Sequence, residues 1–156
     1  MADIVVRDAE PGDAVVVAEL IEEIERYYGA ASVQPIEERV AQVRSALFGV
    51  PPLAWLLLAV DGEEVVGLAA YSFLWPAAGS THSLFLKELY VRPSRRRRGV
   101  GASLMGRVRD IAEARPGCGR VEWQADRDNP VAQAFYRGLG FEESAGKINY
   151  RITLGS

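Results

Sequence analysis

Residues 89–105 read LYVRPSRRRRGVGASLM and predict a strand that runs through an arginine-rich turn into an amphipathic helix. Glycines at positions 99 and 101 let the backbone approach a ligand closely, and the N–H groups at a helix start favour negative charge. Five arginines between residues 92 and 98 add positive charge at the same place. The stretch therefore predicts an anion-binding turn, and a diphosphate suits it.

Two other phosphate-binding motifs do not fit this turn. A Walker A loop needs a Gly-Lys-Ser/Thr ending, and no lysine lies here. A dinucleotide-binding fingerprint needs a third glycine, and Leu104 stands in that place. An arginine run can also bind nucleic acid, or be nothing more than a solvated turn, and both alternatives stay open on the run alone.

Outward from this stretch, apolar spacing and turn residues predict the remaining elements. We expect strands at 4–7, 53–60, 64–75, 83–91 and 121–125, two final strands within 141–154, and helices at 11–28, 35–48, 99–115 and 129–138. The strand, helix and strand between residues 85 and 125 imply a parallel crossover in an otherwise antiparallel sheet. The expected class is α/β (α+β), a mixed, mostly antiparallel sheet flanked by helices, in a single domain over residues 1–156.

Composition narrows the classes of protein further. The 156 residues include one cysteine, Cys118, and one histidine, His82, so neither an internal disulfide nor a structural zinc site of Cys/His type is expected. The sequence has no apolar run long enough to span a membrane, and the opening MADIVVRDAE lacks the pattern of a signal peptide. We therefore expect a cytoplasmic protein without a membrane partner.

Two motifs resemble the GNAT superfamily of acetyl-CoA-dependent N-acetyltransferases. Arg96, Gly99 and Gly101 fit the pattern R/Q-x-x-G-x-G/A, and residues 129–141 fit N-x-x-A-x-x-x-Y-x-x-x-G-F. The expected order of elements agrees with that superfamily along essentially the whole chain. The resemblance implies acetyl-CoA as the acetyl-donor cosubstrate, with no metal.

The resemblance also implies which residues contact this cosubstrate. The backbone of residues 89–91 would pair with the pantetheine arm, and the amides of residues 97–102 would wrap the diphosphate. The implied cofactor-binding set is Leu89, Tyr90, Val91, Arg96, Arg97, Arg98, Gly99, Val100, Gly101, Ala102, Asn129 and Tyr136. Asn129 and Tyr136 lie about two helical turns apart and so share one face.

A direct transfer needs an acid and a base. In the superfamily the tyrosine at the place of Tyr136 commonly protonates the departing thiolate; the alternative is that Tyr136 is a core residue beside Phe135. We expect Glu88 to be the base, either directly or through water, unless it only pairs with neighbouring Lys87. His82 is the second candidate base.

Within the superfamily the chain is most similar to the diamine and polyamine branch, which includes thialysine acetyltransferases. Tyr27 and Glu88 are the implied substrate-binding residues, but Lys87 stands where that branch has an acidic residue. We therefore expect a small primary amine, namely a diamine, an amino acid side chain or an amine-bearing antibiotic, and a homodimer. The alternatives are a protein N-terminus or lysine as acceptor, a nucleic-acid-binding module, and an acetyl-CoA sensor without turnover.

Overall fold

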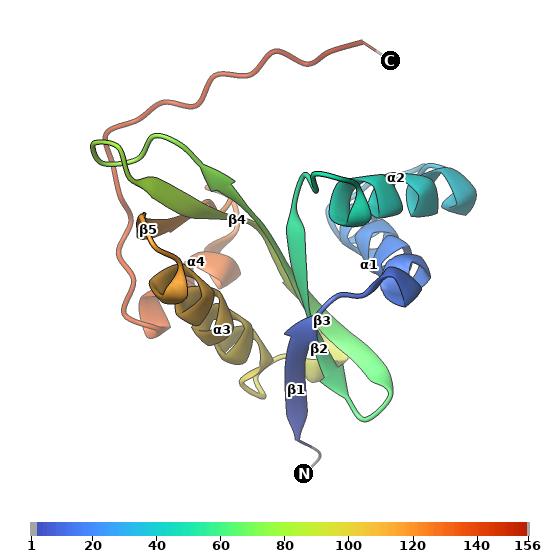
Figure 1. Cartoon of the computed structure of the whole chain (residues 1–156). Helices are drawn as coiled ribbons and strands as arrows, with labels where there is room; N and C mark the ends of the chain where they lie inside the picture. The colour runs from blue at the N-terminus through green and yellow to red at the C-terminus, as the bar shows by residue number, and fades with distance from the viewer. Residues whose placement is uncertain (1–2, 156) are drawn as a thin grey trace. The chain divides into compact units, whose positions relative to one another are not determined.

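The computed structural model describes residues 3–155, which form one mixed sheet and four α-helices (Figure 1). The strands are β1 (Ile4–Asp8), β2 (Trp55–Asp61), β3 (Glu64–Leu74), β4 (His82–Val91) and β5 (Cys118–Trp123), and the helices are α1 (Ala14–Tyr27), α2 (Ile36–Phe48), α3 (Val100–Ala114) and α4 (Pro130–Gly138). Short 3-10 helices at Pro11–Asp13 and Pro93–Arg95 precede α1 and α3. No helix within residues 3–155 has the length and apolar character needed to cross a membrane.

The sheet has the strand order β1-β2-β3-β4-β5. Neighbouring strands are antiparallel except β4 and β5, which are parallel and joined by α3. This confirms the predicted mixed, mostly antiparallel sheet with a parallel crossover. Most predicted strand and helix boundaries lie within a few residues of the observed ones.

The chain forms two compact units, residues 1–124 and residues 125–156. The first unit contains the whole sheet with α1, α2 and α3, and the second contains α4 and the residues that follow it. The single domain expected over residues 1–156 stays a prediction.

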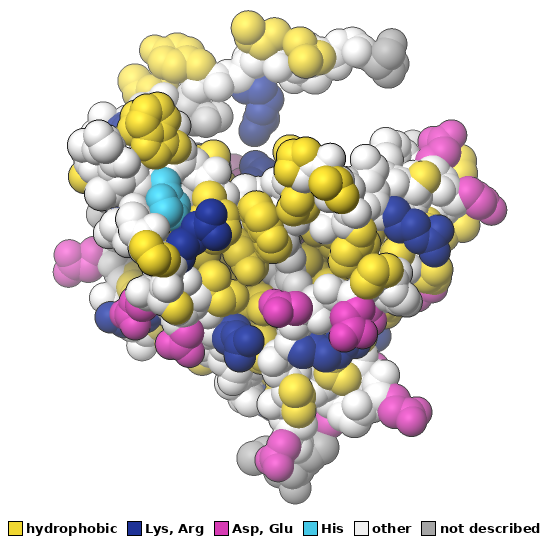
Figure 2. Space-filling model, in the orientation of Figure 1, with side chains coloured by type: hydrophobic (Ala, Val, Ile, Leu, Met, Phe, Trp, Pro, Cys, Tyr) yellow, Lys and Arg dark blue, Asp and Glu magenta, His cyan; other side chains and the backbone are white. Residues whose placement is uncertain are grey.

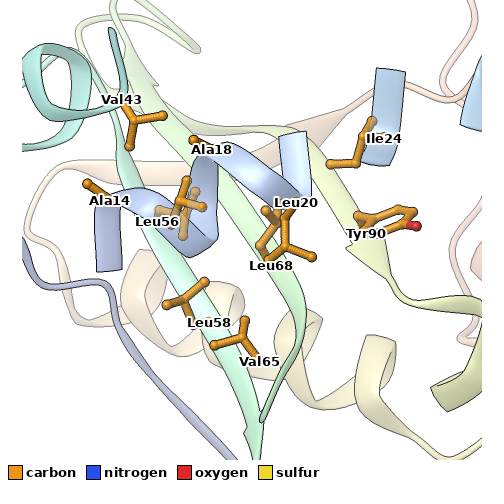
Figure 3. Close-up of a cluster of buried hydrophobic side chains, with 11 residues drawn as sticks. Ala14, Ala18, Leu20, Ile24, Val43, Leu56, Leu58, Val65, Leu68 and Tyr90 are labelled. Carbon is orange, nitrogen blue, oxygen red and sulfur yellow. The ribbon is translucent and has the colours of Figure 1, made fainter. Parts of the chain in front are cut away.

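One main cluster of buried side chains in the first unit joins α1 and α2 to the sheet (Figure 3). It combines residues of both helices with Leu56 and Leu58 of β2, Leu68 of β3 and Tyr90 of β4. Because side chains alternate along a strand, the intervening Leu57 and Ala59 face the opposite side, and both are fully buried there. Both faces of the central strands are therefore covered, which explains why β2 reads as a continuous apolar run.

Gly67 sets how closely α3 and β4 approach β3. A Cβ on Gly67 would lie 2.8 Å from the backbone oxygen of Tyr90 and within 3.5 Å of the side chains of Leu104 and Val100. We expect Gly67→Ala to lower the free energy of unfolding by about 1 kcal/mol, because a single added methyl must displace backbone. Urea denaturation measures this, with Gly106→Ala as the control, since a Cβ at Gly106 meets nothing within 4 Å. Gly106→Ala should be neutral or stabilising, and a Gly67→Ala protein as stable as the parent would contradict the close approach.

Arg7 and Asp13 tie β1 to the start of α1. The guanidinium of Arg7 donates to both carboxylate oxygens of Asp13, at 2.8 and 2.9 Å, and the Glu10 N–H donates to the same carboxylate at 2.7 Å. These hydrogen bonds, above all those from Arg7, lower the pKa of Asp13. The carboxylate is therefore more stable in the folded chain than in the unfolded one.

The lowered pKa of Asp13 predicts how stability depends on pH. The contribution of the pair is complete above the unfolded pKa of about 3.9 and is lost as pH falls through the lower folded pKa. Asp13→Asn should therefore cost roughly 1 kcal/mol at pH 7, and this deficit should shrink below about pH 4. Urea denaturation across this pH range measures it, and a deficit that does not change with pH would argue against the ion pair. Asp110→Asn on the exposed surface of α3 is the matched control.

The two final strands predicted within residues 141–154 are wrong. No strand occurs among residues 141–155 as the structure describes them, and the alternating Ile148, Tyr150, Ile152 and Leu154 are all exposed. An alternating pattern says which side chains share a face, but a strand forms only when its N–H and C=O groups find a partner strand. The alternating pattern carries no information about whether such a partner strand is available.

Candidate functional site

The turn before α3 presents the backbone N–H groups of a helix start. Gly99, the N-cap residue of α3, has φ 80°, and Arg97 is the single non-glycine residue with positive φ in the described chain, at 64°. No side chain caps this helix start, and its first turn contains no acidic residue. Since N–H groups in the first turn of a helix have no partner within the helix, the start of α3 is suited to bind an anion.

The arginines of the turn divide into two groups. Arg92 pairs with Glu23 of α1 at 3.2 Å and with Glu64 of β3 at 3.4 Å. Arg95 pairs with Glu64 at 2.8 Å and with Asp61 of β2 at 3.3 Å. These two arginines therefore fasten the beginning of the turn to the sheet and to α1, and their charge is largely compensated.

Arg96 also binds within the protein, whereas the next two arginines do not. Its Nε donates to the backbone oxygen of Val91 at 2.9 Å, and its guanidinium carbon lies 4.9 Å from the centre of the Tyr27 ring. Arg97 and Arg98 are exposed, and neither makes an ion pair with another described residue. These two are the side chains of the run that remain available for an external anion.

This division weakens the nucleic-acid interpretation of the arginine run. That interpretation assumed a dense cluster of uncompensated charge, but Arg92 and Arg95 already have carboxylate partners. Along the lower part of the face drawn in Figure 2, basic and acidic side chains lie side by side and do not gather into a patch of one sign. Binding to the phosphates of a long polyanion favours an extended basic surface.

The edge of β4 that leads into this turn is only partly covered. β5 pairs with β4 from His82 to Leu86, and no described strand continues the pairing along residues 87–91 on that side. The register between β3 and β4 also shifts at this point, since Ala70 lies opposite Glu88 and Tyr71 opposite Leu86. The bulge at residue 87 separates the two halves of β4, and the second half pairs with β3 but has no described strand on its other side.

Glu88 and Tyr90 lie on the face of β4 that is turned toward α1. Glu88 lies opposite Ala70, which packs against the buried cluster of α1, and Tyr90 belongs to that cluster. Burial, reinforced by the negative charge of Glu23, raises the pKa of the Tyr90 hydroxyl. Tyr27, at the end of α1, is half exposed, and its ring centre lies 6.4 Å from that of Tyr90. The predicted substrate residues Tyr27 and Glu88 therefore lie on the same side of the sheet.

Acidic residues of α1 that could attract a cationic substrate already have partners. Glu22 lies 3.9 Å from Arg26, and Glu25 forms a two-pronged ion pair with the buried Arg39 at 3.0 and 3.1 Å. The hydrogen bonds from Arg39 lower the pKa of Glu25. Glu23 pairs with Arg92, so the charges of Glu22, Glu23 and Glu25 are each balanced by an arginine of the protein.

His82 stands at the opposite end of β4 from the proposed cofactor-pairing residues. Its Nε2 accepts a hydrogen bond from Nε of Arg115 at 3.2 Å, and its ring packs against Phe73. Glu88 lies six positions further along β4, a distance of roughly 20 Å. The structure therefore gives His82 a packing role at the far end of the strand.

In the second unit, motif residues cap both ends of α4. Oδ1 of Asn129 accepts from the Ala132 N–H at 3.1 Å, and Pro130 occupies the first helical turn. At the other end, Gly140 has φ 89° and the Phe141 N–H donates to the backbone oxygen of Tyr136 at 3.0 Å. The side chain of Tyr136 is partly buried, and its ring centre lies 5.2 Å from that of Phe135.

Asn129 and Tyr136 thus lie in the second unit, whereas Tyr27, Glu88 and the residues 89–102 of the predicted set all lie in the first. The role assigned to each residue stays a prediction. Sequence reasoning missed the partners of Arg92, Arg95 and Arg96, because these partners come from α1, β2 and β3 and no local pattern marks them.

The backbone of the first unit fits a CoA-type ligand. The edge of β4 beyond β5 is a strand edge, and strand edges offer N–H and C=O groups of the kind that the amides of a pantetheine arm can bind. The strand ends at the turn where the N–H groups of α3 suit a diphosphate, with Arg97 and Arg98 exposed beside them. No group of three or more His, Cys, Asp or Glu side chains within residues 3–155 could hold a metal ion.

Comparison with known proteins identifies the family and the fold of the chain. The model of the Acetyltransferase (GNAT) family matches residues 17–141. The thialysine N-epsilon-acetyltransferase of Bos taurus is 27% identical over 151 residues, with 92% of this chain and 86% of that protein covered. An integron cassette protein from the mobile metagenome of V. cholerae superposes with a TM-score of 0.87 at 25% identity, over 98% of this chain and 93% of that one.

A solved aminoglycoside N-acetyltransferase in complex with CoA has a TM-score of 0.79 at 21% identity, and the match covers 99% of this chain and 97% of that one. This similarity extends over the sheet and the helices and supports the fold. The family match covers most of the chain, including both motifs. The chain therefore belongs to the acetyltransferase (GNAT) family and is an N-acetyltransferase enzyme.

Proposed function

We propose that this enzyme transfers the acetyl group of acetyl-CoA to a small primary amine by direct attack in a ternary complex. The observation that carries the proposal is the uncapped start of α3, which follows the half of β4 that β5 does not cover. That arrangement matches a ligand with an amide-containing arm and a diphosphate. The CoA bound in the aminoglycoside acetyltransferase of the same fold supports this choice of ligand.

The chain's own groups would hold acetyl-CoA in two ways. The backbone of Leu89, Tyr90 and Val91 would pair with the pantetheine arm as an added strand does. The N–H groups of residues 97–102 would bind the diphosphate, with Arg97 and Arg98 supplying positive charge. Asn129 would contact the same ligand from the start of α4 through its Nδ2, since its Oδ1 is used by Ala132.

The transfer needs two proton movements. The thioester supplies the acetyl group, and its C–S bond breaks as the amine nitrogen forms the new C–N bond. Glu88 would take the proton that the ammonium form of the substrate must lose, directly or through water. Tyr136 would donate its phenolic proton to the departing sulfur, because phenolate and thiolate have comparable basicity.

The acceptor is proposed to be short. Glu88 is a single carboxylate beside Lys87, and Glu22, Glu23 and Glu25 of α1 all lie against arginines. A long polycation would need several uncompensated carboxylates to bind along its length. A diamine, an amino acid side chain or an amine-bearing antibiotic needs fewer, and the thialysine and aminoglycoside acetyltransferases among the similar proteins support this size class.

A protein N-terminus or lysine is the alternative acceptor.

The similarity to the diamine branch also leads us to propose a cytoplasmic homodimer, and sedimentation analysis tests the oligomeric state. Tyr27, half exposed at the end of α1, is proposed to line the acceptor side of the site.

Screening a panel of amines for CoA release tests the function. The panel holds short diamines, thialysine, lysine, aminoglycosides and peptides, and a thiol reagent reports the product. We expect release with at least one small amine and none without an amine. Calorimetric binding of acetyl-CoA with no turnover on any amine would indicate a sensor. DNA or RNA binding that survives excess CoA would favour the nucleic-acid module.

A further inference from the structure

The guanidinium of Arg96 joins three elements of the first unit. Its Nε donates to the backbone oxygen of Val91, the last residue of β4, at 2.9 Å. Its carbon lies 4.9 Å from the ring centre of Tyr27 and 5.7 Å from that of Tyr90. Its Nη1 approaches the Tyr27 hydroxyl at 3.5 Å. One side chain of the turn therefore contacts the end of α1 and the end of β4 together.

The contacts of Arg96 require a guanidinium group. A guanidinium has a planar fork of donors that can bind a carbonyl while its face lies against an aromatic ring, and a lysine ammonium lacks this fork. Two rings near one guanidinium also favour its charge through cation–π attraction. A side chain held in this way is turned toward the protein, whereas Arg97 and Arg98 beside it are exposed.

A second contact joins the same elements. Arg92, at the start of the turn, pairs with Glu23, which lies one helical turn before Tyr27 on α1. The end of α1 is therefore attached to the turn at two points. The two contacts differ in kind, because one is an ion pair and the other is a guanidinium against aromatic rings.

We propose that Arg96 is a positioning residue that holds the diphosphate-binding turn in its shape by clamping it onto Tyr27 and Val91. This inference rests on the proposed function and extends it. Arg96 then connects the two sides of the proposed site. It contacts the end of α1 on the acceptor side and belongs to the turn on the acetyl-CoA side. Loss of the Tyr27 ring should loosen the turn even though Tyr27 is not among the residues proposed to bind the diphosphate.

Amide hydrogen exchange of the ligand-free protein tests the clamp without any ligand. In Arg96→Ala and in Tyr27→Leu, peptides covering residues 92–102 should exchange about fivefold faster or more than in the parent, consistent with loss of a contact of cation–π strength. Tyr27→Phe keeps the ring and should behave as the parent does. Arg109→Ala, an exposed arginine of α3 paired with Glu113, is the matched control and should leave these peptides unchanged.

Acetyl-CoA binding by calorimetry distinguishes a clamp from a direct phosphate contact. With the clamp, Arg96→Ala and Tyr27→Leu each weaken acetyl-CoA binding, and the double variant is no weaker than the poorer single one. Arg96→Lys then fails to restore binding, because a point charge does not replace the fork. The proposal is overturned if the two effects add, if Tyr27→Leu binds as the parent does, or if Arg96→Lys restores full affinity.

Failure of this inference is distinguishable from failure of the proposed function. A parent protein that binds no acetyl-CoA would refute the function, while the exchange of residues 92–102 would still support or overturn the clamp. Unchanged exchange in both Arg96→Ala and Tyr27→Leu would overturn the clamp, whatever the protein binds. Thermal melting of each variant identifies any that has lost its fold, and Tyr27→Phe then still reports whether the ring alone suffices.

Discussion

Tyr136→Phe is expected to lower kcat by on the order of 10²-fold while leaving the affinity for acetyl-CoA nearly unchanged. The substitution removes the phenolic proton that we propose is given to the departing sulfur. The ring and the backbone remain, so the contact with Phe135 and the hydrogen bond from the Phe141 N–H to the Tyr136 carbonyl persist. Steady-state kinetics with a competent amine, and calorimetry with acetyl-CoA, measure the two quantities separately.

Tyr150→Phe is the matched control for this experiment, since Tyr150 also lies in the second unit and is exposed. It removes the same atom and should leave kcat as it is in the parent. If Tyr136→Phe kept the full kcat, Tyr136 would be a packing residue and the proton would have to come from another donor. If it lost kcat and acetyl-CoA affinity together, the hydroxyl would be a binding group.

Gly101→Asp should weaken acetyl-CoA binding by at least about 1.4 kcal/mol, which is roughly tenfold. Gly101 lies in the first turn of α3, where the N–H groups are proposed to bind the diphosphate. An aspartate there brings a side chain and a negative charge against the phosphates. The helix should persist, because an acidic residue in its first turn complements the helix dipole.

Gly106→Asp separates the effect of position from the effect of charge. It makes the same change on the same helix, at a site where an added Cβ meets nothing within 4 Å, and should bind acetyl-CoA nearly as the parent does. Circular dichroism and thermal melting establish that both variants are folded. A folded Gly101→Asp protein with unaltered affinity would refute the placement of the diphosphate and much of the proposed function with it.

The sequence predicted the start and the packing of α3, which depend on neighbouring residues. Glycine at 99 and the apolar spacing of Val100, Leu104 and Val108 are local signals, and α3 starts and packs as they indicate. The caps of α4 were not predicted, although Asn129 and Gly140 bind backbone groups only a few residues away. Hydrogen bonds of this range can be deduced from the sequence because the chain brings their atoms together by geometry alone.

The sequence did not predict how the charges are used. Arg95 finds Asp61 and Glu64 across the sheet, and Arg96 finds Tyr27 at the end of α1. These partners come together only after the sheet has formed. The arginine run alone therefore does not reveal which of its charges are paired with carboxylates and which are exposed. The two strands expected within 141–154 failed for a related reason, since strand pairing is also a long-range property.

The break in pairing at Leu86 also bears on the solubility of the protein. A strand edge with unpaired N–H and C=O groups can recruit the edge of another molecule and so start aggregation. In β4 a bulge and two charged residues lie at the place where pairing with β5 ends. The bulge is at Lys87, whose side chain is exposed, and Glu88 follows it. A bulge and charged side chains are two of the means by which natural sheets discourage edge-to-edge association. Lys87, which stands where the polyamine branch has an acidic residue, therefore protects an edge that the proposed function requires to stay open for acetyl-CoA.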